Sequence, residues 1–477
     1  MSVPSTLPAA PPAAVRPRLG WTLALLALAQ LVYALDLNIV FVALPRIGAD
    51  LGFPGQTQQL VVSAYVVFAG GFLLFGGRAA DLLGRRRVFV LALALYAVSS
   101  LAGGLAASPA VIIAARAVQG IGGALLLPST LALLNSLFAE GPQRNRALAV
   151  WGGAGASGLT IGALLGGLLT EHFGWPAVFF VNVPLAGLVA LGALAVIPRD
   201  PAGRERRRFD VPGALTVTAG STLLVFALVE GPELGWVSPL VVGAFVLAAA
   251  MLAIFALVEA RSADPLMPFR LFRNRSLTAG MLVTFIYMAT FGVLPYFLTV
   301  LLQSVHGYSA LQTGLAFLIP SLAIAAGTQA GERLATRVGT RATLLIGFAI
   351  GVPGTAVLAL GFDADAGYGL LVPGLVVSGL GQGIVWTAMW IAAATGTAAG
   401  EQGVANGIAS TALNLGNAIG LAVFTVVADL GTAGRTGQGL RAAMADGEFL
   451  VVLLTAAVMI AGLLATLILP RRTPTGG

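Results

Sequence analysis

The sequence predicts an all-α membrane protein that crosses the bilayer fourteen times, and three observations lead to this fold class. Residues of the AVILMFWYC set make up 58% of the 477-residue chain, whereas charged residues make up only 9%. A soluble domain carries about 25% charged residues, so this chain has too few charges to cover a water-exposed surface. Apolar segments long enough to span a bilayer recur along the whole chain, and basic residues cluster between them.

A spanning helix needs about 20 mostly apolar residues to cross roughly 30 Å of hydrocarbon. Fourteen segments of the sequence meet this requirement, and the fourth, fifth and thirteenth are rich in glycine, as membrane helices tolerate. The predicted helices cover residues 20–46, 57–77, 88–106, 109–136, 147–170, 177–197, 211–230, 238–260, 276–302, 311–333, 342–361, 369–392, 403–428 and 448–469.

The distribution of the basic residues, all 26 of which are arginines, predicts the orientation of these helices. With both termini in the cytoplasm, 22 arginines fall on the inner side, Arg46, Arg435 and Arg441 fall outside, and Arg116 lies within a helix. Cytoplasmic loops of membrane proteins carry an excess of basic residues, so the split supports an even number of spans. Arginines dispersed in this way also argue against a nucleic-acid-binding face.

Charged segments and a degenerate internal repeat divide the chain into two halves. The motif GRAADLLGRRR at residues 77–87 returns in degenerate form as ERLATRVGTR at residues 332–341, each after the second helix of a six-helix unit. Two related halves around a central site are a known transporter architecture. The predicted organisation is a disordered cytoplasmic N-terminus (1–19), a six-helix bundle (20–198), a cytoplasmic linker with two extra spanning helices (199–275), a second six-helix bundle (276–470) and a cytoplasmic tail (471–477).

The composition also excludes several kinds of chemistry. The chain has no cysteine, so it offers neither a disulfide nor a thiolate metal site. Its two histidines, His172 and His306, are isolated in the sequence. Without any lysine it cannot contain a nucleotide-binding Gly-x-x-x-x-Gly-Lys-[Ser/Thr] loop. We therefore expect no metal, no cofactor and no enzymatic activity.

Four motifs in the first half resemble signatures of one transporter family. LDLNIVFVALP at residues 35–45, GRAADLLGRRR at 77–87, RAVQGIGG at 116–123 and GLTIGALLGG at 158–167 are similar to motifs of the fourteen-spanner drug:proton antiporters of the major facilitator superfamily. The segment GWPAVFFVNVP at 174–184 also resembles a helix junction of that group, whereas Ala163 stands where its motif has proline. The resemblance implies a major facilitator fold and multidrug or antibiotic efflux across a plasma membrane, of the bacterial cytoplasmic type.

Asp36 and Arg116 are the charges that the sequence places deep within the first half. An ionisable residue inside a membrane is costly and marks a functional site by default. We expect Asp36, Arg116 and Gln119 to couple transport to protons or a cation, since a change in hydration and separation would load and release a proton. The alternative is a permanent ion pair that only locks the first helix to the fourth.

The motif after the second helix is expected to act as a cytoplasmic gate. By resemblance, Asp81 pairs across the interface between the halves and holds the inner side closed, together with Gly77, Gly84 and Arg85. In the alternative interpretation the arginines of this motif are only positive-inside anchors of the membrane helix.

The glycines of the fifth helix predict close helix packing. Gly158, Gly162 and Gly166 recur every four residues and so share one face, where another backbone can approach. With Gly167 they form the antiporter motif, which by resemblance seals the path against leakage; tight packing alone is the simpler interpretation.

Aromatic and amide side chains are the candidates for a substrate cavity, which is expected to be apolar with a few polar groups. These candidates are Tyr33, Tyr65, Tyr287, Tyr296, Trp386, Trp390, Asn414 and Asn417. We expect no acidic residue away from the ends of the last six helices. The cavity therefore suits lipophilic molecules that are neutral or carry few positive charges.

The leading interpretation is a proton-coupled antiporter that exports lipophilic drugs or antibiotics by alternating access. It is expected to be a monomer whose partners are a small-molecule substrate, protons and the lipid bilayer, with no nucleic acid. A transporter of the same fold for another solute, such as a siderophore, lipid precursor or metabolite, is the alternative. A receptor or enzyme would need a polar cluster or an appended soluble domain, and the sequence shows neither.

Overall fold

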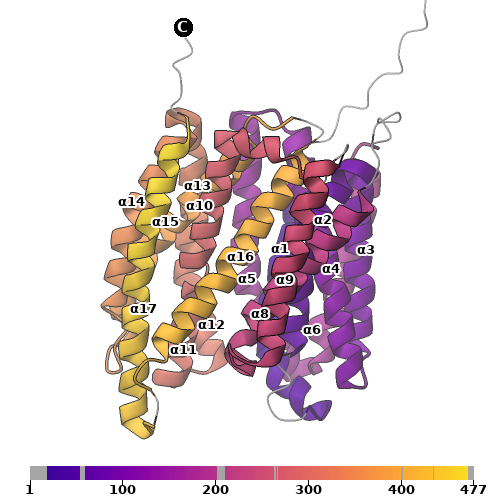
Figure 1. Ribbon diagram of the computed structural model, residues 1–477. Coiled ribbons are helices and arrows are strands. Elements are labelled where there is room, and N and C mark those ends of the chain that lie inside the picture. Colours follow the sequence, from indigo (N-terminus) through magenta and orange to yellow (C-terminus); the bar gives the residue numbers. More distant parts are fainter. Residues whose placement is uncertain are drawn as a thin grey trace, which may run out of the picture.

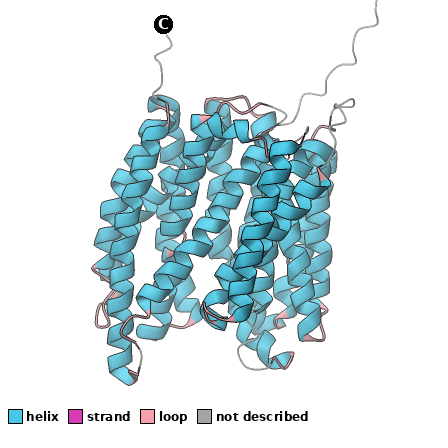
Figure 2. Cartoon of the chain, in the orientation of Figure 1, coloured by secondary structure: helices cyan, strands magenta, loops and turns pink. Residues whose placement is uncertain are grey.

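The computed structural model describes residues 19–53, 60–200, 210–262, 265, 267–398, 401–432 and 434–470. Within these residues all regular secondary structure is helical, and the helices lie side by side in one bundle (Figure 1; Figure 2). This architecture confirms the predicted all-α class.

The helices follow one another along the chain with short connections. The first seven are α1 (Leu19–Asp50), α2 (Leu60–Leu83), α3 (Arg85–Gly104), α4 (Pro109–Leu137), α5 (Pro142–Phe173), α6 (Pro176–Phe180) and α7 (Asn182–Val196). Next come α8 (Val211–Leu234), α9 (Pro239–Arg261) and the 3-10 helix η2 (Phe269–Arg273). The remainder are α10 (Arg275–Thr290), α11 (Leu294–Val300), the π-helix η3 (Leu301–Val305), α12 (Ala310–Ala316), α13 (Leu318–Val338), α14 (Thr340–Ala359), α15 (Tyr368–Ala394), α16 (Gln402–Ala428), α17 (Gly437–Ala465) and the 3-10 helix η4 (Thr466–Ile468).

Thirteen segments of the described chain are long and apolar enough to cross a membrane. Some consist of helices in series, such as α6 with α7 and α12 with α13. α5 is 32 residues long but is not among the thirteen, because the side chains of three positions within it lie outside the described residues. By length and composition the structure thus gives thirteen spans where we expected fourteen.

The helices pack as two groups with a pair between them. α1–α7 contact one another chiefly through α1–α5, α2–α4 and α3–α4, and α10–α17 through α14–α15, α13–α15 and α10–α16. We name these the first group and the second group. α8 and α9 form the inserted pair, which packs through α8 on α2 and α16, one helix from each group. In Figure 1 this pair lies in front of the junction between the groups.

Several helices extend further than the sequence predicts, and α2 and α17 are two examples. α2 continues to Leu83, so most of the motif at residues 77–87 is helical, and the chain breaks only at Gly84, where φ is 104°. Glycine adopts this left-handed conformation without the steric cost that other residues meet. α17 begins at Gly437 rather than at residue 448. Its first turns contain alanine and methionine, which favour helix.

α1 and α5 pack backbone against backbone through a row of glycines. A Cβ atom on Gly158 would lie 2.6 Å from the carbonyl oxygen of Leu31, and one on Gly166 would lie 2.7 Å from that of Ile39. Gly162, midway between them, abuts the same helix in the same manner. The spacing of four residues thus matches one turn of α1 with one turn of α5, as small-residue packing in membranes requires.

Gly167, the fourth glycine of the motif, does not abut the α1 backbone as the other three do. A Cβ atom there would have Val42 as its nearest neighbour, at 3.9 Å, which is an ordinary van der Waals contact. A step of one residue rotates a helix by about 100°, so Gly166 and Gly167 cannot both face α1. The side chain of Ala163, at the position of the family's proline, lies outside the described residues.

We predict that Gly162→Ala destabilises the protein by about 1–3 kcal/mol, because overpacking forces backbone shifts of this cost. Gly167→Ala is the matched control, since the same methyl group in the same helix would make only an ordinary van der Waals contact. Thermal unfolding of both variants in detergent checks the prediction. Equal melting temperatures for the two variants would show that the α1–α5 contact tolerates the methyl group.

Candidate functional site

A buried ion pair joins α1 to α4 inside the first group. Arg116 Nη1 lies 2.7 Å from Asp36 Oδ2, and the two side chains are 1% and 0% exposed, respectively. Both residues lie in apolar helices that qualify as membrane spans. An unpaired charge in such a place is strongly unfavourable, so each residue supplies the counter-charge that the other requires.

The Asp36 carboxylate is held by three side-chain donors. Besides Arg116, Gln119 donates to Oδ1 at 2.9 Å and Asn182 donates to the same oxygen at 2.7 Å. Asn182 is the first residue of α7 and is fully buried. The carboxylate is therefore satisfied as an anion, because every one of these groups donates to it.

Arg116 is equally well satisfied. Its Nε donates to the carbonyl oxygen of Val61 in α2 at 3.1 Å, and its Nη1 donates to Gln119 Oε1 at 2.9 Å. The guanidinium carbon lies 4.3 Å from the centre of the Tyr65 ring, a cation–π geometry. Gln119 in turn donates to the hydroxyl of Ser100 in α3 at 2.9 Å. Five helices (α1, α2, α3, α4 and α7) thus meet at one polar core.

Tyrosine hydroxyls continue this core. The hydroxyls of Tyr65 and Tyr96 lie 3.1 Å apart, and Tyr33 hydrogen-bonds to Tyr65. Gly123 makes room for them, because a Cβ atom there would lie 2.9 Å from the Tyr65 hydroxyl and 3.1 Å from the Tyr33 ring. The glycine of the RAVQGIGG motif therefore has a packing role beside the ion pair.

The sequence placed Asp36, Arg116 and Gln119 together but missed Asn182, Ser100 and Tyr96. Asn182 carried a usable signal, because an amide within the apolar segment 176–196 needs a polar partner. Ser100 and Tyr96 carried none, since small hydroxyls and tyrosines are common in membrane helices.

Asp81 connects the two groups. Its Oδ2 accepts the backbone N–H of Val404 at 2.9 Å, and Val404 is the third residue of α16. The first N–H groups of a helix lack partners within the helix and carry partial positive charge, so a carboxylate stabilises them. Arg85 lies 3.6 Å from the other carboxylate oxygen of Asp81. We name the end of the bundle that holds these residues the Asp81 end.

Glycines allow this contact between α2 and α16. A Cβ atom on Gly77 would collide with the backbone of Gly403 and lie 3.0 Å from the Cα atom of Gly407. At the turn after α2, Asp200 lies beside Gly84 and accepts the N–H groups of Arg86 and Arg87, both at 3.3 Å. Asp200 therefore stabilises the N-terminus of α3, a role the sequence did not reveal.

Further polar contacts between the groups occur at the same end of the bundle. Asn135 of α4 donates to Asn406 of α16 at 3.4 Å, and Asn145 of α5 donates to Thr336 of α13 at 3.2 Å. Near them the rings of Trp151 in α5 and Trp386 in α15 are almost parallel, with centroids 6.1 Å apart. We name this set of contacts, together with that of Asp81, the seam.

The structure separates the predicted cavity residues. Tyr33 and Tyr65 lie at the ion pair of the first group, whereas Tyr287 packs on Trp386 in the second group with ring centroids 5.5 Å apart. Trp390 is buried at the seam. The remaining candidates lie elsewhere: Tyr296 is 45% exposed, and Asn414 and Asn417 are half-buried on α16. These eight residues do not form one cluster.

Glu448 corrects the expectation that the last six helices hold no acidic residue away from their ends. Because α17 starts at Gly437, Glu448 lies well inside this helix, and its side chain is 2% exposed. Gly447 next to it abuts Ala428, the last residue of α16. Among the described residues no three His, Cys, Asp or Glu side chains lie together as a metal site would require.

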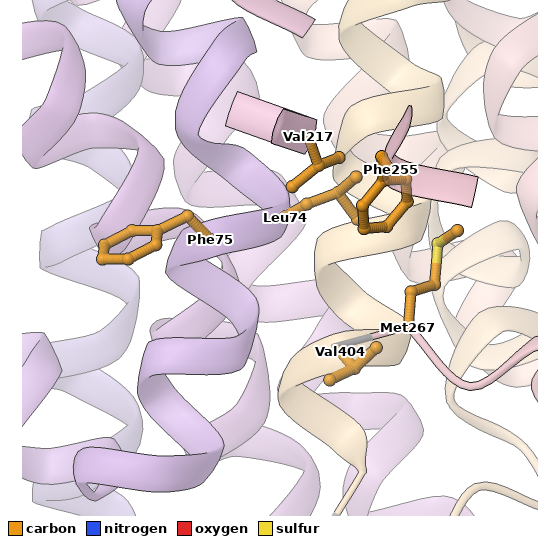
Figure 3. A pocket seen from close by; sticks show the side chains of 6 residues that line it. All are labelled: Leu74, Phe75, Val217, Phe255, Met267 and Val404. Atoms are coloured by element: carbon orange, nitrogen blue, oxygen red, sulfur yellow. The ribbon is translucent and has the colours of Figure 1, made fainter. Parts of the chain in front are cut away.

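A small apolar pocket lies where the inserted pair meets α2 and α16. Its empty volume is about 250 Å³, and its walls consist of six apolar side chains (Figure 3): Leu74, Phe75, Val217, Phe255, Met267 and Val404. Val404 belongs both to this pocket and to the contact with Asp81. The pocket is thus separate from the ion pair and borders the seam.

Comparisons with known proteins agree with this architecture. A family model described as Major Facilitator Superfamily matches residues 26–421 and 280–476. The chain is 40% identical over 420 residues to the cephamycin export protein CmcT of Amycolatopsis lactamdurans, over 85% of this chain and 84% of that protein. It is 37% identical over 421 residues to the puromycin resistance protein pur8 of Streptomyces alboniger, over 87% and 83% respectively. The solved structure of the human organic anion transporter MFSD10 (TETRAN) is similar with a TM-score of 0.67 at 19% identity, over 94% of this chain and all of that one (100%).

Two groups of membrane helices that meet along a seam, with a buried ion pair in one of them, define a multi-pass membrane transporter. The chain belongs to the major facilitator superfamily, among its antibiotic-resistance and drug-export members. It is therefore a transporter of small molecules in the plasma membrane and not an enzyme.

We predict that Asn182→Ala destabilises the protein by about 1–3 kcal/mol, because the buried Asp36 carboxylate loses one of its donors. Asn414→Ala is a suitable control, since the Asn414 amide donates to the Ser410 carbonyl of its own helix at 3.0 Å. Thermal unfolding in detergent measures both. A similar small effect for the two variants would mean that the ion pair does not depend on α7.

Proposed function

We propose that this protein is a proton-coupled antiporter that exports lipophilic drugs or antibiotics, neutral or cationic, from the cytoplasm by alternating access. The relatives support the substrate class, because one is named for cephamycin export and another for puromycin resistance. The observation that carries proton coupling is the buried Asp36–Arg116 pair. The protein acts as a monomer in this proposal.

The proposed topology has fourteen spans with both termini in the cytoplasm. In this proposal α5 supplies the fourteenth span, since it packs along α1 and on α13, both of which belong to the thirteen spans found among the described residues. The Asp81 end is then the cytoplasmic side. It carries Arg85, Arg86 and Arg87, in agreement with the excess of basic residues inside.

The seam acts as the inner gate of this transporter. Asp81, Gly77, Gly84 and Arg85 bring the end of α2 against the start of α16, which belongs to the other group. In this proposal the contacts of the seam, which include a cap bond, amide contacts and an aromatic pair, are weaker than the network around the ion pair, so the seam opens first. Release of Asp81 from α16 then admits substrate from the cytoplasm.

Asp36 is the proton-carrying group in this proposal. Three donors hold the carboxylate as an anion in the state described. A shift of α4 or α7 that withdraws these donors leaves a buried charge without partners, and uptake of a proton relieves this cost. Arg116 and Gln119 would thereby exchange partners as the protein changes state. The competing interpretation, a permanent ion pair, requires that the donors never leave.

The substrate path runs between the two groups and is lined by aromatic residues. The positions of Tyr33 and Tyr65 near the ion pair, and of Tyr287, Trp386 and Trp390 in the second group, support this proposal. Asn414 and Asn417 on α16 offer polar contacts at its side. Tyr296 finds no such support because its ring is 45% exposed.

We predict that Asp36→Asn abolishes proton-driven export. An amide has nearly the same shape as the carboxyl but cannot exchange a proton, so a pH gradient should drive no uptake of a fluorescent lipophilic drug into inverted vesicles. Asp50→Asn in the same helix is the control. Asp50 accepts the Trp175 indole N–H at 3.1 Å, and the amide oxygen of asparagine can still accept this bond. Normal proton-driven transport by Asp36→Asn would exclude Asp36 as the proton carrier.

We predict that Asp81→Ala opens the inner gate more often. Loss of a helix cap costs about 1 kcal/mol, which corresponds to about a fivefold change in the ratio of two states. The chain has no cysteine, so Ala405→Cys, at a position 1% exposed in α16, gives a clean reporter. Maleimide labelling of this thiol should become about fivefold faster with Asp81→Ala.

Glu140→Ala provides the matched control for the gate experiment. Glu140 pairs with Arg144 at 3.7 Å and is largely exposed, so its loss removes a carboxylate near the same end without touching α16. It should leave the labelling rate unchanged. Equal labelling in the Asp81→Ala and parent proteins would contradict the gate role of Asp81.

A further inference from the structure

Three tryptophans form a cluster across the seam. Trp151 comes from α5 in the first group, and Trp386 and Trp390 come from α15 in the second. The Trp151 ring stands edge-on to Trp390 with centroids 5.6 Å apart, and Trp386 stands edge-on to Trp390 at 5.9 Å. We name these residues the indole cluster. Tyr287 extends it on the side of Trp386.

All three indole N–H groups of this cluster are buried without an acceptor among the described residues. A buried tryptophan N–H usually finds a hydrogen-bond partner. Trp175 of the same chain follows this rule, because its Nε1 donates to Asp50 at 3.1 Å. Leaving a buried donor unsatisfied costs about 1–3 kcal/mol. Three such donors at one place, at the meeting of two mobile groups, indicate a site built to donate to something else.

The orientation of two of the rings also suits a flat ring inserted between them, and we name the space that would open between these rings the slot. The planes of Trp151 and Trp386 differ by only 13°, and their centroids lie 6.1 Å apart on opposite sides of the seam. A flat ring inserted between two parallel rings needs a spacing of about 7–8 Å, twice the contact distance between carbon atoms. Separation of the groups widens this slot. Gly152 beside Trp151 lets Trp386 approach, because a Cβ atom there would lie 2.6 Å from the Trp386 ring.

We propose that the indole cluster is a substrate-binding site for planar, neutral molecules that carry carbonyl oxygens. The faces of Trp151 and Trp386 stack on the flat ring system, and the indole N–H groups donate to its carbonyl oxygens. A cation is recognised by ring faces but gains nothing from N–H donors. This inference rests on the proposed export function and narrows its substrate class to acceptor-bearing planar compounds.

The same residues then link binding to gating. When the seam is open, the slot faces the cytoplasm and its donors are free to bind substrate. When the seam closes, Trp151 packs on Trp386 and Trp390 and occupies the place of the flat ring. The substrate and the closed cluster cannot occupy this site together. Closure of the seam therefore moves the substrate out of the site and into the rest of the path.

Two flat probes with the same three-ring skeleton, which differ in the carbonyl acceptor and in charge, test the proposal. 10-Methylacridone is a flat, neutral three-ring compound with one carbonyl oxygen, and 10-methylacridinium is the same ring system as a cation without that oxygen. Their affinities for the full-length protein in nanodiscs are measured by fluorescence anisotropy. The parent protein should bind the acridone more tightly.

Tryptophan-to-phenylalanine variants isolate the N–H donors, because phenylalanine keeps an aromatic face and removes the donor. Trp151→Phe, Trp386→Phe and Trp390→Phe are tested one at a time. At least one variant should lower the affinity for the acridone by about 2- to 10-fold, the usual value of one net hydrogen bond. The same variant should change the affinity for the acridinium less than twofold. Trp236→Phe, remote in the connection between α8 and α9, should change neither.

Unchanged acridone binding in all three variants, or equal weakening of both probes, would overturn the proposal and leave aromatic packing as the role of the cluster. Melting temperatures of the variants identify any that fold poorly, and the preference of the parent protein for the acridone over the acridinium is an independent measurement. Failure of this site is distinguishable from failure of the export function. The Trp386→Phe protein is also tested for proton-driven transport of a lipophilic cation, which has no carbonyl oxygen to bind. This transport measures export independently of the proposed carbonyl-binding site.

Discussion

A charge inside a bilayer has no water to solvate it, and the contact between Asp36 and Arg116 meets this constraint for the first group. Gln119 and Asn182 donate to Asp36, and Arg116 donates to the Val61 carbonyl, so donors and acceptors from several helices meet at the pair. Each of these groups would be left unsatisfied in hydrocarbon if its helix moved alone. In the state described, the pair therefore holds together the helices that share it.

The contacts across the seam differ in kind from the contacts within the first group. Within the first group, glycines of α5 meet carbonyls of α1 over several turns, and the ion pair lies nearby. Between the groups the contacts are a helix cap at Asp81, two amide contacts and aromatic pairs, each worth about 0.5–2 kcal/mol. The unsatisfied donors of the indole cluster oppose these gains by a similar amount. Near-balance of this kind is what a transporter requires, because neither the closed nor the open seam can be strongly preferred.

The sequence was informative where membrane physics leaves few choices. Composition and segment length predicted an all-helical membrane protein, and the rarity of intramembrane charge singled out Asp36 and Arg116. It was uninformative where a partner lies far along the chain, as for Asp200 at the start of α3 or Trp151 against Trp386. Glu448 was misplaced for a third reason: hydropathy ends a span at a charged residue, whereas helix propensity carries α17 back to Gly437. Gly166 and Gly167 are neighbours in the motif, but one residue along a helix turns to another face, so only Gly166 abuts the α1 backbone.

α2 and α4 are placed to connect the ion pair with the seam. α2 offers its Val61 carbonyl to Arg116 near one end and Asp81 to α16 near the other, about 30 Å apart at 1.5 Å per residue. α4 carries Arg116 and, further along, Asn135, which contacts Asn406 of the second group. Protonation of Asp36 would weaken its ion pair with Arg116. Arg116 contacts α2 and belongs to α4, and both of these helices also contact α16. The coupling between proton and gate thus needs no long chain of side-chain contacts, because two stiff helices touch both sites and move together with the body that contains them.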